Sequence, residues 1–141
     1  MPPLSLDLLP HRPPMRLVEE IVEVVPGELA RARRVAHPGD WYFQGHFPGE
    51  PIVPAIVLVE LLAQTGGIAA CSKENGVATR TNLRVAGFTG FKFPAAARPH
   101  DVLDATARVV GRMGGMIRIE GEVTVNGTRV AVGGVTLAET P

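Results

Sequence analysis

Two residues in the segment FQGHFPGEPIVPAIVLVELLAQ, residues 43–64, have side chains suited to moving protons. His46 stands among glycines and prolines, and Glu60 is the only ionisable residue between Ile52 and Cys71. An imidazole can accept a proton near pH 7. Apolar surroundings disfavour the charged form of a carboxyl group, so that it stays protonated and can donate. His46 and Glu60 are therefore a candidate base and a candidate acid.

Each of these residues also has a structural interpretation. A lone histidine in a loop is more often structural than catalytic. A buried glutamate can instead pair with an arginine from a neighbouring strand. Considered one at a time, both residues remain open between the two roles.

The start of the following apolar segment adds a third chemical element. Pro54 stands where a helix would begin, which is a favoured position for proline. The next amides, of Ala55 and Ile56, would then be free donors at the positive end of the helix dipole. They could stabilise a negative charge developing on a carbonyl oxygen. The base, the acid and this helix end together favour proton abstraction beside a carbonyl, followed by loss of a protonated hydroxyl.

The elements that must position these groups can be predicted from the sequence pattern. Residues 53–71 have the length and composition of a helix that is apolar on nearly every side, which indicates a helix wrapped by other structure. Ile56, Glu60, Gln64 and Gly67 share one face of this helix. The preceding residues, 37–54, form a long loop rich in glycine and proline, and such loops are usually functional.

The rest of the chain is strand-like. Residues 15–36 predict two strands around a turn at Pro26–Gly27, and Asn126–Gly127 is typical of a type I′ hairpin. A short helical segment is predicted at residues 4–9, and further strands are predicted at roughly 79–91, 102–111, 116–125 and 128–138. We therefore expect a single α+β domain over residues 1–141, with one central helix and five to six mostly antiparallel strands. An unpaired edge strand would make edge-to-edge dimerisation plausible.

Composition excludes several classes of protein. Lysine plus arginine equals aspartate plus glutamate at 14 each, which argues against a general nucleic-acid binder. A single cysteine, Cys71, allows no intramolecular disulfide or cysteine metal cluster. Pro54, Glu60 and Gln64 interrupt the apolar stretch, which argues against a membrane span. The N-terminus lacks the pattern of a signal peptide. We expect a soluble, cytoplasmic protein.

Three other histidines have weaker signals. His11 and His37 lie beside prolines, which favours surface or packing roles, and His100 is most simply a turn residue. No pair of histidines has the spacing His-x-x-x-His, so no metal site is predicted.

With these motifs in view, the chain resembles the β-hydroxyacyl-acyl carrier protein dehydratases of the FabZ/FabA type. The segment FQGHFPGEPIVPAIVLVELLAQTGG is similar to their active-site segment, and LLPHRPPMRLVEEI is similar to their start. GFTGFKFPAAARPHDVL resembles a further stretch that leads to Pro-Gly-Asp in the family. The likeness covers nearly the whole chain in order.

The resemblance implies a hotdog fold, a long helix wrapped by a curved antiparallel sheet. It implies that His46 is the catalytic base and Glu60 the acid, with His46 from one chain and Glu60 from the other across a dimer interface. It further implies that Gln64 supports the acid, that the Ala55 amide contacts the thioester carbonyl, and that Gly45 lets the loop approach the substrate. Neither a redox cofactor nor a metal is implied. The assembly would be a homodimer, or a hexamer built as a trimer of dimers.

Three positions bear on the details. Glu60 resembles the acid of the dehydratase-only type, since the type that also isomerises the double bond carries aspartate there, and the resemblance therefore argues against isomerase activity. The family's Pro-Gly at the helix start is Pro54–Ala55 here, and its Pro-Gly-Asp is Pro99–His100–Asp101. An alanine with helical dihedrals would cost little, but its methyl group could narrow the pocket. The turn at His100 must tolerate a side chain.

Residues downstream suggest how the substrate is held. Ile56, Phe88 and Phe91 are candidates for lining the acyl tunnel. An acyl carrier protein is acidic, so four nearby cations could steer it: Arg80, Arg84, Lys92 and Arg98. The alternative is that each of these cations is a solvent-exposed strand residue with no role in binding the carrier protein. Two other functions stay open, a hotdog acyl thioesterase and a non-catalytic partner of acyl carrier protein.

Overall fold

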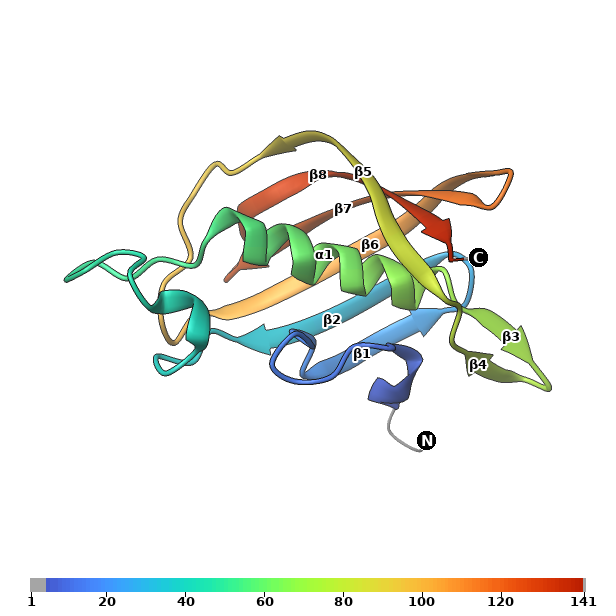
Figure 1. The fold of residues 1–141 in the computed structure, drawn as a ribbon, viewed down its shortest axis with the longest axis horizontal. Helices are drawn as coiled ribbons and strands as arrows, with labels where there is room; N and C mark the ends of the chain where they lie inside the picture. The colour runs from blue at the N-terminus through green and yellow to red at the C-terminus, as the bar shows by residue number, and fades with distance from the viewer. Residues whose placement is uncertain (1–4, 141) are drawn as a thin grey trace.

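In a computed structural model that describes residues 5–140, one helix lies across the hollow face of a curved sheet (Figure 1). The helix, α1, spans Ala55–Ala69. Two 3-10 helices, η1 and η2, span Leu6–Leu8 and Trp41–Phe43. The strands are β1 (Glu20–Val25), β2 (Leu29–Val35), β3 (Ser72–Glu74), β4 (Val77–Thr79), β5 (Leu83–Lys92), β6 (Val102–Met113), β7 (Met116–Val125) and β8 (Thr128–Glu139).

The main sheet has six antiparallel strands in the order β1-β2-β6-β7-β8-β5. Strands β1 and β5 form its two edges, and β5 curves over α1 (Figure 1). The predicted α+β arrangement, a long helix wrapped by an antiparallel sheet of five to six strands, is confirmed.

Turn residues account for the connections. Gly27, at φ 81°, joins β1 to β2, and the pair Asn126 and Gly127 has the positive φ angles that a type I′ turn needs. Both predicted turns are confirmed. The hairpin β3–β4 was not predicted from the sequence. The two strands are three residues long, too short to show an alternating pattern.

The ends of α1 lie two residues inside the predicted range of 53–71. Val53 lies before the helix, and its N–H donates to the carbonyl of Ala97 over 2.8 Å. Pro54 has a ψ of 142°, so the helix begins at Ala55. A helical segment was predicted at residues 4–9. Residue 4 lies outside the described residues, and among the others only Leu6–Leu8 form a helix.

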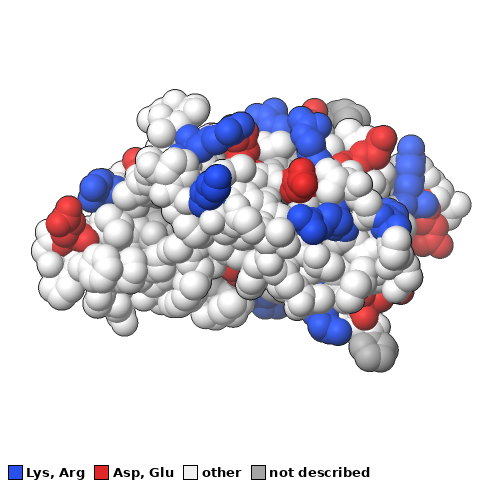
Figure 2. Space-filling model, turned by 90° about the horizontal axis from the view of Figure 1, so that it is seen from above, with Lys and Arg blue, Asp and Glu red and all other residues white. Residues whose placement is uncertain are grey.

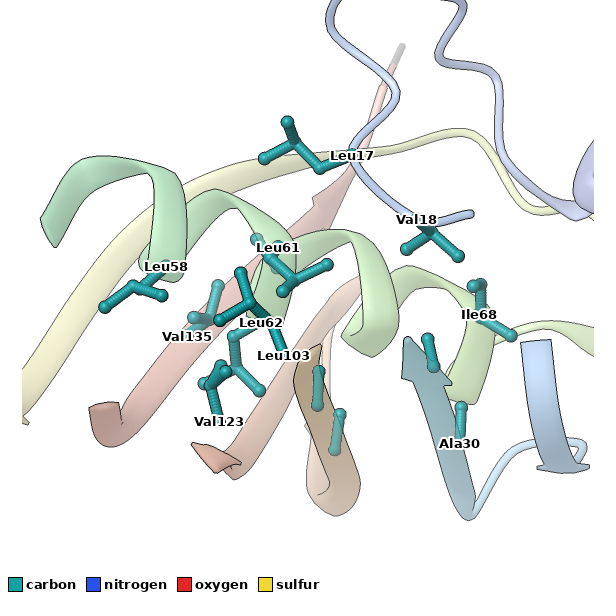
Figure 3. Close-up of a cluster of buried hydrophobic side chains, with 14 of the residues drawn as sticks. Leu17, Val18, Ala30, Leu58, Leu61, Leu62, Ile68, Leu103, Val123 and Val135 are labelled. Carbon is teal, nitrogen blue, oxygen red and sulfur yellow. The ribbon is translucent and has the colours of Figure 1, made fainter. Parts of the chain in front are cut away.

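The core lies between α1 and the sheet (Figure 3). Leu58, Leu61, Leu62 and Ile68 of the helix are buried in one cluster with strand residues such as Val123 and Ala30. A fully buried leucine contributes about 1.5–3 kcal/mol relative to an exposed one. The helix approaches β7 closely at Gly121, where an added Cβ would lie 2.8 Å from Leu62 Cδ1 and 2.2 Å from the Thr106 oxygen.

One face of the first helical turns remains uncovered. Ile56 is 75% exposed, whereas the C-terminal half of α1 is almost entirely buried. The prediction of a helix apolar and wrapped on nearly every side is therefore correct only for that half. This uncovered face is where the candidate chemistry lies. No helix among residues 5–140 is long and apolar enough to span a bilayer.

Candidate active site

The loop before α1 holds His46 in one orientation. Gly45 and Gly49 have φ angles of 77° and 76°, which favour glycine. The His46 N–H donates to the Phe43 carbonyl over 3.1 Å. The ring atom Nδ1 lies 3.1 Å from the carbonyl oxygen of Ile52. Because a carbonyl can only accept, Nδ1 carries the proton and Nε2 is left as the acceptor.

The start of α1 presents backbone donors beside this loop. No side chain caps the helix at Pro54, and Val57 and Leu58 donate to the Pro54 carbonyl. The first amides, of Ala55 and Ile56, have no acceptor within the helix. Ala55 is exposed and helical, without a positive φ. Its methyl group therefore costs the backbone little, and its N–H can meet a ligand oxygen.

Glu60 is held by Gln64, one turn further along α1. Gln64 is 1% exposed, and its Oε1 accepts from the backbone N–H groups of Leu17 at 2.9 Å and Val18 at 3.4 Å. Its Nε2 donates to the Met15 carbonyl at 2.7 Å and to Glu60 Oε1 at 3.0 Å. Both the oxygen and the nitrogen of the Gln64 side-chain amide are therefore engaged in hydrogen bonds. The second carboxyl oxygen of Glu60, Oε2, is left for a substrate.

Two expectations about Glu60 need correction. The side chain was expected to be buried, but it is 30% exposed in the single chain, because the nearby face of α1 is uncovered. The alternative, a salt bridge with an arginine of the sheet, does not occur among the described residues. The nearest ionisable group is His11, whose Nε2 lies 3.6 Å from Glu60 Oε1.

His11 is a residue whose position the sequence reasoning missed. We assigned it a surface or packing role, yet it lines a cavity of about 340 Å³ together with Glu60, Gln64 and Thr81. Its membership of the LLPHRPP motif was the available signal.

Glu60 also lines a second, apolar cavity of about 510 Å³. Ile56, Phe88 and Phe91, the residues expected in the acyl tunnel, all line it, and Ala55 lines it too. Met15 and Trp41 line it as well, and neither was singled out from the sequence. The walls are uncharged apart from Glu60, which suits an acyl chain.

His46 lines a different cavity, of about 550 Å³, together with Gly45. Ala55 and Ile56 belong to both the His46 cavity and the apolar cavity, so the start of α1 lies between them. None of these cavities is lined by both His46 and Glu60. The single chain therefore presents His46 and Glu60 in separate cavities that share the start of α1.

A buried polar cluster lies behind the loop. Burial, and the hydrogen bond that it donates to Asp40, raise the pKa of Tyr42 to about 12. Burial would by itself raise the pKa of Asp40, but hydrogen bonds from Tyr42, Arg34 and the His37 amide outweigh it and lower that pKa. Burial would lower the pKa of Arg34, but its interactions with Tyr42 and Asp40 outweigh burial and raise that pKa. Arg34 and Asp40 are therefore a stable ion pair.

The expected cations are exposed. Arg80, Arg84 and Lys92 lie on or beside β5, and Arg98 is 3.8 Å from Glu50. In Figure 2, the face seen from above carries charges of both signs, and the half toward the start of α1 has few of them. His37 pairs with Glu19, and His100 occupies a turn at φ 75°. Within residues 5–140 no three histidine, cysteine or acidic side chains are grouped to hold a metal.

Comparison with known proteins gives consistent results. A family model described as a FabA-like domain matches residues 9–133. The chain is 38% identical to a 3-hydroxyacyl-[acyl-carrier-protein] dehydratase FabZ of Myxococcus xanthus, over 91% of this chain and 84% of that protein. It is 37% identical to the FabZ of a Roseiflexus species, over 94% and 92%.

A solved structure has the same fold at low identity. The dehydratase heterocomplex ApeI:P from Xenorhabdus doucetiae superimposes with a TM-score of 0.76 at 17% identity, covering 96% of this chain and 90% of that one. The fold is thus the hotdog fold.

Proposed function

The chain belongs to the FabA-like family, and we propose that it dehydrates 3-hydroxyacyl-acyl carrier protein thioesters to trans-2-enoyl thioesters in fatty-acid or related biosynthesis. The proposal takes residues 1–141 as a single dehydratase domain that works in the cytoplasm. The observation that carries it is the position of Ala55 and Ile56 between the His46 cavity and the Glu60 cavity.

The geometry supports a proton transfer in two parts. In the neutral imidazole of His46, Nδ1 donates to Ile52, and Nε2 is then the nitrogen that removes a proton from the carbon beside the thioester carbonyl. The Ala55 N–H stabilises the negative charge that develops on the carbonyl oxygen. Glu60 then donates its proton through Oε2 to the leaving 3-hydroxyl. The products are an enoyl thioester and water, and a proton passing from His46 to Glu60 resets the site.

The apolar cavity is the proposed binding site of the acyl chain. Ile56, Phe88 and Phe91 line it between α1 and β5, and Glu60 lies where the reacting end would be. Gly45, beside His46, lets the loop approach the thioester without a side chain in the way. The glutamate at position 60 fits dehydration without double-bond isomerisation.

The same proposal places each site across a homodimer, which can assemble further into a trimer of dimers. The uncovered surface near α1 includes apolar side chains that a partner chain would bury, Ile56 at 75%, Phe88 at 59% and Trp41 at 46% exposure. Edge strand β5 carries Phe88 and pairs only with β8 among the described residues. Two copies meeting here would bring His46 of one chain toward Glu60 of the other.

Acyl carrier protein is the proposed partner. The exposed cations near β5 could guide an acidic carrier to the cavity, through a rate effect that salt would weaken. Reversing the charges of Arg84 and Lys92 should therefore slow turnover of carrier-bound substrate more than turnover of a small thioester. If the charge reversal slowed both substrates by the same factor, or slowed neither, these cations would not be a docking surface for the carrier protein.

The first experiment follows the absorbance of a short trans-2-enoyl thioester on addition of the protein, beside the variants His46→Ala and Glu60→Gln. Hydration by the wild type that both variants lose, without release of thiol, is the expected result. Release of free thiol would instead identify a thioesterase. Binding of carrier protein without either reaction would identify a non-catalytic partner.

A further inference from the structure

A charged side chain lies on the core-facing side of β2, behind the site. Arg34 follows Ala30 and Ala32 on that face and is only 9% exposed. A buried guanidinium is costly unless its donors are satisfied. Its Nη2 donates to Asp40 Oδ2 at 2.8 Å, and its Nε donates to the Tyr42 hydroxyl at 3.3 Å.

Tyr42 and the His37 amide supply the remaining hydrogen bonds of the cluster. The Tyr42 hydroxyl donates to Asp40 Oδ2 at 2.6 Å, and Tyr42 is 4% exposed. The His37 amide donates to the same carboxyl oxygen at 3.0 Å. Asp40 Oδ2 therefore accepts three hydrogen bonds.

A chain of hydrogen bonds runs from this cluster to the acid. Arg34 Nη1 donates to the Leu17 carbonyl at 3.0 Å. The Leu17 N–H donates to Gln64 Oε1 at 2.9 Å, and Gln64 Nε2 donates to Glu60 at 3.0 Å. Leu17 is thus held by Arg34 on one side and holds the amide of Gln64 on the other.

A second connection runs from the cluster to the base. Asp40 immediately precedes η2, and Tyr42 lies within it. Phe43, the last residue of η2, accepts the His46 N–H at 3.1 Å. In Figure 1, β2 runs toward the end of the molecule where η2 and this loop lie.

We propose that Arg34, Asp40 and Tyr42 form a positioning unit that sets the orientation of Glu60, through Leu17 and Gln64, and the path of the loop that carries His46. This inference rests on the dehydratase function proposed above. If each site takes its base and its acid from different chains, one such unit acts on two sites at once. None of the three residues lines the apolar cavity. Tyr42 lines the His46 cavity, but its hydroxyl is engaged by Asp40 and Arg34, so the three residues position catalytic residues without being catalytic.

The kinetic test uses conservative variants. Tyr42→Phe keeps the ring and removes its hydroxyl, and Arg34→Lys keeps the charge but loses the branched guanidinium. Arg33→Lys is the matched control, because Arg33 is the adjacent residue of β2 and pairs with Asp104 outside the cluster. We expect kcat for enoyl hydration to fall about 10- to 100-fold in both cluster variants. KM should change less than about threefold, and the control should keep kcat within about twofold.

Unchanged kcat in both cluster variants, or an equal loss in Arg33→Lys, would overturn the proposal. The thermal midpoint of each variant shows whether the chain is folded. A double variant tests the route to the acid: Tyr42→Phe with Gln64→Ala should lose less than the product of the two single losses, because both act on Glu60. Multiplicative losses would refute the route through Gln64.

A readout independent of turnover separates this proposal from the proposed function. The chain has two glutamines, so the side-chain amide signals of Gln64 in a nitrogen–proton NMR spectrum can be assigned by their loss in Gln64→Ala. Both cluster variants should shift these signals, and Arg33→Lys should not. Unshifted signals would overturn the positioning role whatever the activity. Shifted signals in a protein whose wild type is inactive would support the positioning role and refute the dehydratase function.

Discussion

Gln64 donates a hydrogen bond to Glu60 Oε1 over 3.0 Å, from one turn further along α1. The amide cannot turn around, because its own oxygen accepts the Leu17 N–H and its nitrogen also serves the Met15 carbonyl. The carboxyl group is therefore oriented before any substrate binds, with Oε2 left free. Preorganisation of this kind lowers the cost of reaching the transition state.

Replacing Gln64 should lower both activity and stability. Gln64→Ala removes the donor to Glu60 and takes away the partner of the buried Leu17 N–H and of the part-buried Met15 carbonyl. We expect a 10- to 100-fold loss in kcat, and a loss of about 1–3 kcal/mol in the free energy of unfolding. Enoyl hydration and denaturant unfolding measure the two effects. Full kcat in a destabilised variant would assign Gln64 a purely structural role.

Mixing two inactive variants tests the site across the dimer. Chains carrying His46→Ala and chains carrying Glu60→Gln should be inactive alone. After they are unfolded and refolded together, random pairing should make half of the dimers mixed. Each mixed dimer would contain one site with both native residues, so about a quarter of the wild-type activity should return. No recovery in mixed dimers would mean that both residues act within one chain.

A charge at Ile56 should prevent dimerisation. Ile56 is the most exposed side chain of the apolar surface on α1, and Ile56→Glu would bury a carboxylate at the proposed interface. Sedimentation should show monomers, and Trp41, the single tryptophan, should become more accessible to a fluorescence quencher. Val110→Glu is the control, since Val110 is 51% exposed on β6. Dimers that persist in Ile56→Glu would place the interface elsewhere.

The Tyr42 hydroxyl should lose its proton only at a pH well above that of an exposed tyrosine. Tyr42 is the single tyrosine, so tyrosinate absorbance reports it alone, and its pKa is raised to about 12 by burial and by its bond to Asp40. The unfolded chain ionises near pH 10. The stability that this shift represents, about 2–3 kcal/mol, is present below pH 10 and is lost as the pH rises through 12. A native titration midpoint near pH 10 would contradict the buried cluster.

The turn at His100 should gain stability from glycine. His100 has a φ of 75°, a conformation that disfavours residues with a side chain, while its N–H donates to the Ala36 carbonyl at 2.7 Å. His100→Gly should raise the free energy of unfolding by about 0.5–1 kcal/mol, with activity unchanged. His100→Ala keeps the unfavourable φ and should gain nothing. An equal gain in both variants would make the imidazole, and not the backbone, the cause.

Much of the fold followed from local patterns. The strand-like pattern on either side of Pro26–Gly27 predicted β1 and β2, Asn126–Gly127 predicted the hairpin of β7 and β8, and an apolar run predicted α1, because each signal needs only neighbouring residues. The hairpin at Asn75–Gly76 was missed because its strands are too short to alternate. The open face of α1 at Ile56 was missed because the composition of the helix indicates burial without saying which residues a single chain covers.

The sequence by itself determined the residue types of the site, His46 and Glu60 on either side of a helix start, and the helix and sheet that carry them. Only the tertiary structure decided which imidazole nitrogen is free and which carboxyl oxygen is held. It also decided that His11 lies beside Glu60, and that Arg34 is linked to Glu60 through Leu17 and Gln64. The physical reason is distance along the chain. Leu17 and Gln64 are 47 residues apart, and their hydrogen bond exists only once the segment before β1 has packed against α1.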